Sequence, residues 1–422
     1  MLLLFKIKNY TSFNKESILD LRATTYTQHP SHIINTGNDS IVKTTAIYGA
    51  NASGKSNFIS AMFFFKHYIF SQFISKSNDQ SIEAPIKDNG IWEPYQLLNK
   101  NDEPAEFEII FLRNGNQIQY GFECKENLIT NEWYYLNDKL VFERGLNATL
   151  SFGKEYKQRL QMYNKIPSER LYVSVLEYFL EDKEKEEILG DFISFFSKEF
   201  NVFSEILFES TVKRLAGSTL INKKLIENAK YRKTISEYLA KIDIGIKGLA
   251  IVDEVRKDES GKTHKQKTVQ SIHNVFDKNG KIVDTKNFDL SQESSGTLRF
   301  LAYIQNVVDM IENGGVFIVD EMSARLHPLL TKLIVDIFQS SSNNKAQLVF
   351  TTHDISLLNH SQFRRDEVVF VDKNEKGESS LYALSDLKVR EDATFSKDYL
   401  QGKYCAIPIF DYDSIIGGVS DE

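Results

Sequence analysis

Residues 49–56 read Gly-Ala-Asn-Ala-Ser-Gly-Lys-Ser and match the phosphate-binding loop pattern G-x-x-x-x-G-K-[ST] at every fixed position. Residues 45–48 predict a short buried strand before the loop, and residues 56–73 predict a helix after it. The glycines allow the backbone to wrap around phosphate groups, which the N–H groups at the helix start then face. A glycine-containing turn before an ordinary helix is the simpler alternative, but the flanking elements disfavour it. The sequence therefore predicts nucleotide binding.

The loop also predicts which groups hold ATP and Mg²⁺. Lys55 is expected to reach the β- and γ-phosphates, and the Ser56 hydroxyl is expected to ligate Mg²⁺. The other residues expected to bind the nucleotide are Gly49, Asn51, Ala52, Ser53, Gly54 and Asn57.

Length and composition limit the class of protein. The 422 residues suggest roughly two to three domains, or one large domain with an insertion. A 41% hydrophobic and 26% charged composition is that of a globular protein, and a formal charge of −7 excludes a uniformly basic nucleic-acid surface. The two cysteines, Cys124 and Cys405, form no metal-binding or disulfide framework. With no apolar run of membrane-spanning length found, we expect a cytoplasmic protein without a membrane partner.

The chain divides into three predicted parts. Residues 1–153 contain the phosphate loop and a series of hairpins over 106–142, expected to form the antiparallel half of a mixed sheet. Residues 154–245 lose the strand signal and predict a helical insertion, whose residues 213–233 are rich in lysine and arginine. That basic stretch is either a solvated helix face or a contact for nucleic acid or an acidic partner. Residues 246–422 return to strands, first at 246–255 and 267–276, and complete the core.

A second apolar strand ends in two acids, Asp320 and Glu321, and is the expected counterpart of the phosphate loop. Asp320 can hold Mg²⁺ through water, and Glu321 can orient and deprotonate the attacking water. The same tetrapeptide, Ile-Val-Asp-Glu, also occurs at residues 251–254. Only the later copy is followed by a loop, a helix and another apolar strand, as a parallel β-α-β unit requires. We therefore assign the catalytic role to Glu321 and the metal role to Asp320 with Ser56.

Two further segments complete the predicted site. His353 follows the strand at 347–351 and is the second expected catalytic residue, placed to contact the γ-phosphate, although a lone histidine is more often only a satisfied polar residue. Residues 290–297, Leu-Ser-Gln-Glu-Ser-Ser-Gly-Thr, precede a helix whose N-terminus can bind an anion through Ser294 and Gly296. A second phosphate site is useful when two subunits enclose ATP between them.

With these motifs in order, the sequence resembles the ABC-type ATPase heads of the SMC, RecF and OLD-like group. It is most similar to the AAA15-type ATPases, which include ATPase subunits of anti-phage systems such as PARIS. The resemblance rests on the phosphate loop and on six further segments: 5–13, 293–297, 320–321, 326–328, 352–354 and 399–408.

The resemblance implies an α/β fold, an ABC/SMC-like P-loop ATPase head. It also implies a homodimer or higher homo-oligomer with ATP at the subunit interface, and control of a separate effector, a nuclease, in anti-phage defence. The sequence departs from the pattern in lacking the Leu-Ser-Gly-Gly-Gln signature of transporters, and Gln96 is only a weak match to the Q-loop glutamine. Residues 411–413, Asp-Tyr-Asp, are interpreted as an acidic tail and not as part of a TOPRIM nuclease.

Two other functions stay open at this point. A DNA-repair or recombination ATPase would bind DNA directly, through the basic stretch at 213–233. A scaffold that binds ATP without hydrolysing it is disfavoured by Glu321.

Overall fold

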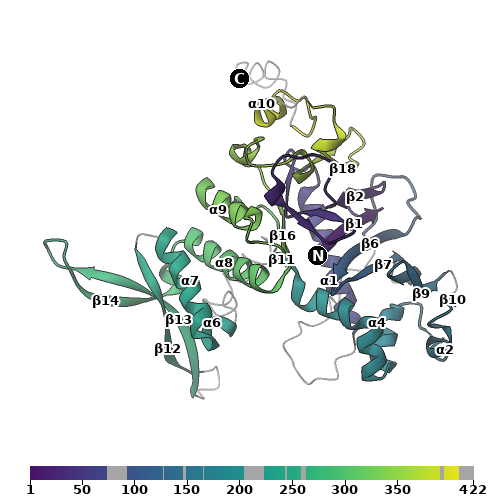
Figure 1. The fold of residues 1–422 in the computed structure, drawn as a ribbon, viewed down its shortest axis with the longest axis horizontal. Helices are drawn as coiled ribbons and strands as arrows, with labels where there is room; N and C mark the ends of the chain where they lie inside the picture. The colour runs from purple at the N-terminus through teal and green to yellow at the C-terminus, as the bar shows by residue number, and fades with distance from the viewer. Residues whose placement is uncertain are drawn as a thin grey trace, which may run out of the picture.

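The computed structural model describes residues 1–73, 93–126, 128–145, 149–164, 166–203, 223–242, 245–257, 263–389 and 394–407. In these residues the strands form four sheets (Figure 1). The two largest belong to the main body of the molecule, and a three-stranded sheet projects from it.

The phosphate loop belongs to a mixed sheet of six strands. Their spatial order is β11 (Phe200–Phe203), β15 (Gly315–Val319), β16 (Ala346–Thr351), β5 (Thr44–Tyr48), β17 (Val368–Lys373) and β18 (Ser379–Ala383). The first five are parallel, and β18 is antiparallel to β17. Strands β5, β15 and β16 are buried along their whole length, as expected for parallel strands covered on both faces. The predicted α/β P-loop fold with a mixed sheet is confirmed.

Helices cover both faces of this sheet. Helix α1 (Lys55–Gln72) packs in the core that contains Ile47 of β5, whereas Ala46 and Tyr48 face the opposite core. That second core is filled by α8 (Ser295–Asn313) and α9 (Pro328–Gln339). Successive side chains of β5 therefore point into two different hydrophobic cores, one on each face of the sheet.

The hairpin series forms a separate antiparallel sheet of seven strands. Their order is β10 (Leu150–Phe152), β9 (Lys139–Arg144), β8 (Leu128–Leu136), β7 (Asn116–Lys125), β6 (Ala105–Arg113), β1 (Leu2–Lys8) and β2 (Ser17–Asp20). The predicted strands are confirmed. The prediction that they share one mixed sheet with the phosphate-loop strands is wrong, because they form a sheet of their own. The reason is that β6 pairs with β1 at the N-terminus, for example Phe5 opposite Ile109, which closes that edge to the phosphate-loop strands.

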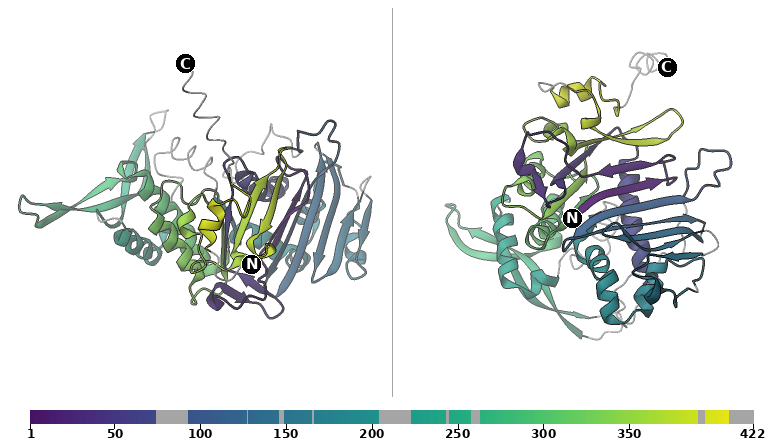
Figure 2. Two further views of the ribbon diagram at one scale, coloured as in Figure 1. Left: turned by 90° about the horizontal axis from the view of Figure 1, so that it is seen from above. Right: turned by 45° about the vertical axis from the view of Figure 1, so that its right-hand side comes forward.

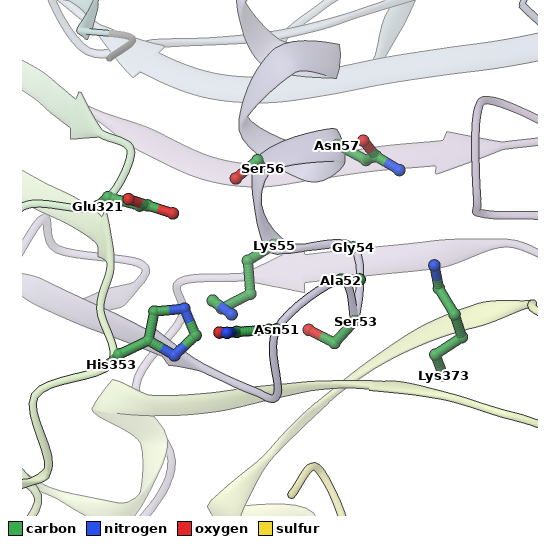
Figure 3. A pocket seen from close by; sticks show the side chains of 10 residues that line it. All are labelled: Asn51, Ala52, Ser53, Gly54, Lys55, Ser56, Asn57, Glu321, His353 and Lys373. Atoms are coloured by element: carbon green, nitrogen blue, oxygen red, sulfur yellow. The ribbon is translucent and has the colours of Figure 1, made fainter. Parts of the chain in front are cut away.

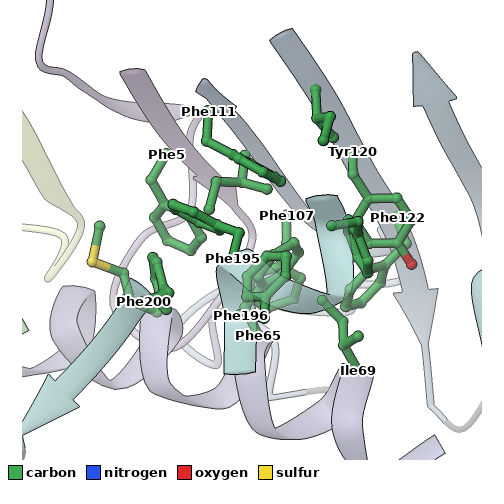
Figure 4. Close-up of a cluster of buried hydrophobic side chains, with 14 of the residues drawn as sticks. Phe5, Phe65, Ile69, Phe107, Phe111, Tyr120, Phe122, Phe195, Phe196 and Phe200 are labelled. Atoms are coloured by element: carbon green, nitrogen blue, oxygen red, sulfur yellow. The ribbon is translucent and has the colours of Figure 1, made fainter. Parts of the chain in front are cut away.

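Aromatic side chains join α1 to this antiparallel sheet (Figure 4). The ring of Phe65 stacks on Phe122 of β7 with centroids 5.4 Å apart, and meets Phe5 of β1 edge-on at 5.7 Å. Phe195 and Phe196, which follow α4 (Asp182–Ser194), complete the cluster in η3 (Phe195–Glu199). Much of the phenylalanine content is therefore used to hold the loop helix against a second sheet.

The segment 154–245 is not wholly helical. Its helices are α2 (Lys157–Leu160), α3 (Tyr172–Phe179), α4, α6 (Lys223–Glu227) and α7 (Ala229–Ile242). The prediction missed β11, whose four residues pair with β15 and are too short to show a strand period. Buried side chains of α3 and α4 belong to the same core as α1, and those of α6 and α7 to the core of α8. The division into 1–153, 154–245 and 246–422 stays a prediction.

An arm of three antiparallel strands extends from the body (Figures 1 and 2). It consists of β12 (Ile246–Lys257), β13 (Thr263–Phe276) and β14 (Ile282–Asp289), with β13 in the centre. The first two strands were predicted and are confirmed, whereas β14 was not predicted. Helix α7 packs on the arm through Tyr231, Ile235 and Leu239, which share a core with Leu249.

The remaining elements are short. They are β3 (Ile33–Asn35), β4 (Ser40–Val42), α10 (Phe395–Leu400), and the 3-10 turns η1 (Pro30–His32), η4 (Leu290–Gln292), η5 (Ile355–Leu357), η6 (Arg365–Glu367) and η7 (Leu384–Asp386). Among the helices in the described ranges, none is long and apolar enough to span a membrane.

Candidate nucleotide site

The phosphate loop connects β5 to α1 through a backbone that few side chains would tolerate. Gly54 has a φ of +116° and precedes the first residue of α1, while Ala52 has a φ of +60°. A Cβ at Gly49 would overlap the carbonyl oxygen of Val371 in β17, and one at Gly54 would overlap the Ser379 hydroxyl in β18. Both glycines are therefore required by conformation or close approach.

The loop lines a cleft of about 590 Å³, a volume within the range of small-molecule sites. Its walls come from four separate segments (Figure 3). The lining residues are Asn51, Ala52, Ser53, Gly54, Lys55, Ser56, Asn57, Glu321, His353 and Lys373. Seven of the predicted loop residues and both predicted catalytic residues thus meet in one cleft, and Gly49 lies two residues before the first of them, Asn51.

Lys55 is buried against the loop that carries it. Its ammonium group donates to the carbonyl oxygens of Gly49 and Ala50, each at 2.9 Å. Burial lowers the pKa of Lys55 from 10.5 to about 8, although the nearby Glu321 and Asp320 favour its charged form. An incoming phosphate would supply the negative charge that these two neutral carbonyls lack.

A chain of polar contacts joins the loop helix to the ends of β15 and β16. The hydroxyl of Ser56 donates to Oδ1 of Asp320 at 3.3 Å. The same carboxylate oxygen accepts from Thr351 Oγ1 at 2.7 Å, and Thr351 Oγ1 accepts from the N–H of Glu321, also at 2.7 Å. Thr351 therefore fixes both acidic residues, and the φ of +50° at Glu321 places its side chain at the cleft wall.

These groups fit a magnesium ion bound together with a nucleotide. No cluster of three or more His, Cys, Asp or Glu residues able to bind a metal occurs in the described ranges. Mg²⁺ commonly uses one or two protein oxygens and completes its shell with phosphate oxygens and water. Ser56 and Asp320 provide such a pair. The buried Ser53 hydroxyl has no hydrogen-bond partner in the described part of the chain, which leaves one donor for a phosphate oxygen.

His353 and Lys373 lie on opposite sides of the loop (Figure 3). Desolvation, and then the charge of Lys55, lower the pKa of His353 and so favour the neutral form of its ring. Lys373, at the end of β17, was not found from the sequence. A lysine that ends a strand before an Asn-Glu-Lys-Gly turn has no motif of its own, and only the sheet order places it beside the loop.

A group of hydroxyl and amide side chains contacts the phosphate loop at the carbonyl of Ser53 and at the start of α1. Ser379 of β18 donates to the carbonyl oxygen of Ser53 at 2.6 Å, and its own oxygen lies at hydrogen-bond distance, 2.8 Å, from Ser12 Oγ. Asn57 Nδ2 donates to Ser12 Oγ, at 2.8 Å. Asn57 thus faces this group as well as the cleft, so its contribution to the site includes holding the start of α1 in place.

The comparison with known families agrees with this geometry. A family described as "AAA domain, putative AbiEii toxin, Type IV TA system" matches residues 44–359, which is most of the chain. The chain belongs to this AAA-domain family. Its match begins at β5 and includes every lining residue of the cleft except Lys373. Among curated proteins, no match to this AAA-domain protein is found.

Solved structures similar to this AAA domain include three SMC heads at low identity. An SMC head bound to the C-terminal winged-helix domain of ScpA is 15% identical, with a TM-score of 0.43, covering 90% of this chain and 97% of that one. An SMC head from Thermotoga maritima is 14% identical, with a TM-score of 0.38 and coverage of 92% and 99%. An SMC head with an extended coiled coil bound to the C-terminal domain of ScpA, derived from Pyrococcus furiosus, is 14% identical, with a TM-score of 0.38 and coverage of 96% and 98%.

Ser294 and Gly296 lie outside the cleft of this AAA domain. Ser294 is the N-cap of α8, and its hydroxyl accepts from the N–H of Thr297 at 3.1 Å. Neither residue lines the cleft in the described chain. Within one subunit the structure therefore does not bring this predicted anion site to the phosphate loop.

The alternative candidates lie elsewhere. Asp253 of the repeated tetrapeptide is exposed in β12, opposite Lys267. Gln96 is exposed in the segment before β6 and does not line the cleft. Residues 411–413 fall outside the described ranges.

The basic stretch at 213–233 is described only from residue 223 onward. In that part, Lys224 donates to Asp309 of α8 at 2.6 Å. Lys223 and Lys233 lie 3.5 and 4.0 Å from the glutamates four residues further along their helices. These ion pairs reduce the positive charge that the helices present.

Proposed function

We propose that this AAA domain is an ATPase that binds ATP with Mg²⁺ in the cleft and hydrolyses it. The observation that carries the proposal is the contact chain from Ser56 through Asp320 and Thr351 to Glu321, opposite the buried Lys55. In it, Ser56 and Asp320 would hold Mg²⁺, and Lys55 would bind the β- and γ-phosphates. Glu321 would orient and deprotonate the attacking water, and His353 would contact the γ-phosphate.

The proposed active form is a homodimer or higher homo-oligomer with ATP at the subunit interface. The support for it is the place of Ser294 and Gly296 at the start of a 19-residue helix, outside the cleft of their own subunit. A helix N-terminus attracts anions, so a second subunit can offer these residues to the γ-phosphate. ATP would then close this interface between the subunits, and hydrolysis would open it.

The proposed biological role is control of a separate effector, a nuclease, in anti-phage defence inside the cytoplasm. The description of the family names a toxin of a type IV toxin–antitoxin system, which supports a role in a regulated system of more than one protein. The second candidate is a DNA-repair ATPase that binds DNA directly. The ion pairs of Lys223, Lys224 and Lys233 argue against it, because they neutralise part of the basic stretch.

The test compares four variants in ATP binding by calorimetry and in phosphate release. Lys55→Ala is expected to lose ATP binding, and Glu321→Gln is expected to keep ATP but to lose roughly 10²- to 10⁴-fold in turnover. Asp320→Asn should weaken Mg²⁺-dependent turnover, whereas Asp253→Asn, in the repeated tetrapeptide, should leave both quantities unchanged. Equal nucleotide retention by Lys55→Ala and Glu321→Gln would refute the assignment.

The effector is tested by isolating tagged Glu321→Gln protein with ATP and Mg²⁺ from its host and identifying the bound material by mass spectrometry. A stoichiometric nuclease or toxin-like protein supports effector control and names the partner. Recovery of DNA without another protein supports the repair function instead.

A further inference from the structure

Strand β14 forms the outer edge of the arm. It pairs with β13, and no other described strand lies on its far side. Its first six residues, 282–287, are all exposed. The hairpin tip adds apolar surface, since Phe276, Ile282 and Val283 are 57%, 53% and 58% exposed. An edge of this kind is a template for pairing with another chain.

At the centre of β14, one backbone N–H group bonds to a neighbouring side chain and not to another strand. The N–H of Thr285 donates to the carboxylate of Asp284 at 2.7 Å, which is a local substitute for a strand partner. Figures 1 and 2 show the β13–β14 hairpin extending away from the body, so a second strand can approach it.

The side chains of β14 are complementary to the same strand in reverse order. In an antiparallel pair of two β14 strands centred on Thr285, Asp284 lies opposite Lys286 of the second copy, and Lys286 lies opposite its Asp284. Ile282 comes opposite Phe288 of the second copy, at both ends of the pair. Charges on edge strands usually prevent indiscriminate pairing. In β14, however, the order of Asp284 and Lys286 favours pairing with a second copy of the same strand.

We propose that β14 is a docking strand through which two copies of this chain pair in antiparallel register, whether or not ATP is bound. The contact is separate from the ATP-dependent interface, because none of its residues lines the cleft. It leads directly to the predicted anion site, since β14 continues through η4 into Ser294 and α8. The carboxylate of Glu293 in this connection lies 2.7 Å from Nε2 of His273 in β13, which fixes the arm to the start of α8.

The test uses charge swaps at the two exposed central positions. Sedimentation velocity of the full chain is measured over a concentration series, without nucleotide and with EDTA. The single variants Asp284→Lys and Lys286→Asp each turn two attractive cross-strand contacts into two repulsive ones, and should weaken dimerisation roughly 10- to 100-fold. The double variant D284K/K286D exchanges the charges and should restore the wild-type dimer. An equimolar mixture of the two single variants should form a mixed dimer, because all four charges again meet opposite partners.

Three results would overturn the proposal. They are a wild-type chain that stays monomeric throughout the series without nucleotide, a double variant that dissociates as the single variants do, and single variants that do not combine when mixed. Circular dichroism melting controls for folding, since both positions are exposed and should leave stability unchanged. The same series with Lys55→Ala separates this contact from the proposed function, because loss of ATP binding should not affect it.

Discussion

Replacing Thr351 by valine tests how the cleft is held together. Thr351 is fully buried at the end of β16, and its hydroxyl bonds to two groups at once. It donates to the Asp320 carboxylate and accepts from the Glu321 N–H, and valine has nearly the same shape but can do neither. The variant thus removes both contacts while leaving the packing intact.

The size of the effect follows from these two contacts. A hydrogen bond to a charged group contributes about 1.5–3 kcal/mol, and a buried N–H left unpaired costs about 1–3 kcal/mol. The Glu321 N–H is only partly buried, and the added methyl group gains some apolar burial. We therefore expect Thr351→Val to lower the free energy of unfolding by roughly 2–4 kcal/mol. Turnover should also fall, because Glu321 loses the contact that fixes its backbone.

Thr45→Val is the matched control, on the neighbouring strand β5. Its hydroxyl is buried and has no hydrogen-bond partner among the described residues. The same substitution there should be neutral or stabilising, by up to about 1 kcal/mol. Urea unfolding followed by circular dichroism, with ATP hydrolysis on the same samples, measures both variants. If the two differ by less than about 0.5 kcal/mol, the contacts of Thr351 do not hold the cleft.

Lys373→Ala should weaken ATP binding about fivefold in calorimetry, which is the effect expected from the loss of one exposed charge contact. Lys376→Ala, in the adjacent turn, is the control and should have no effect on ATP binding. Equal losses of affinity in the two variants would contradict the place of Lys373 in the cleft. Burial holds the pKa of Lys55 at about 8, and phosphates favour its charged form, so ATP binding near pH 9 should take up about one proton, and near pH 6 none from this group. Calorimetry in two buffers of different ionisation enthalpy detects this uptake, and its absence near pH 9 would be inconsistent with Lys55 contacting phosphate. Burial raises the pKa of Glu132, a fully buried residue of β8, from 4.5 to about 7, so the stability it contributes is present below pH 4.5 and lost as the pH rises to about 7. In Glu132→Gln, the midpoint of urea unfolding should depend less on pH over that interval. If the pH dependence of the midpoint is unchanged, another group titrates.

Much of the cleft was predictable because its chemistry is local in sequence. The phosphate loop needs two glycines, a lysine and a hydroxyl within eight residues, and this spacing can be read from the sequence without knowledge of the fold. The strand that ends in Asp320 and Glu321 could be separated from its copy at 251–254 by the segments that come after each copy. The structure places the later copy at the cleft and the earlier one on the arm.

The supporting contacts were not predictable, because they join residues far apart in the chain. Ser12 and Ser379 meet under the loop across 367 positions. Lys373 enters the cleft only because β17 pairs with β5. Strand β11 is four residues long, and its partner β15 decides its conformation, which no local pattern can show.

The order of strands in the mixed sheet also constrains how the protein is made. Strand β5 ends at Tyr48, whereas its two neighbours in the sheet, β16 and β17, begin only at Ala346 and Val368. A nascent chain leaving the ribosome must therefore wait for residues 346–373 before β5 has any partner, with its apolar strands exposed in the meantime. Chains that stop before residue 346 cannot assemble the sheet that carries the phosphate loop, because β5 then has neither of its strand partners.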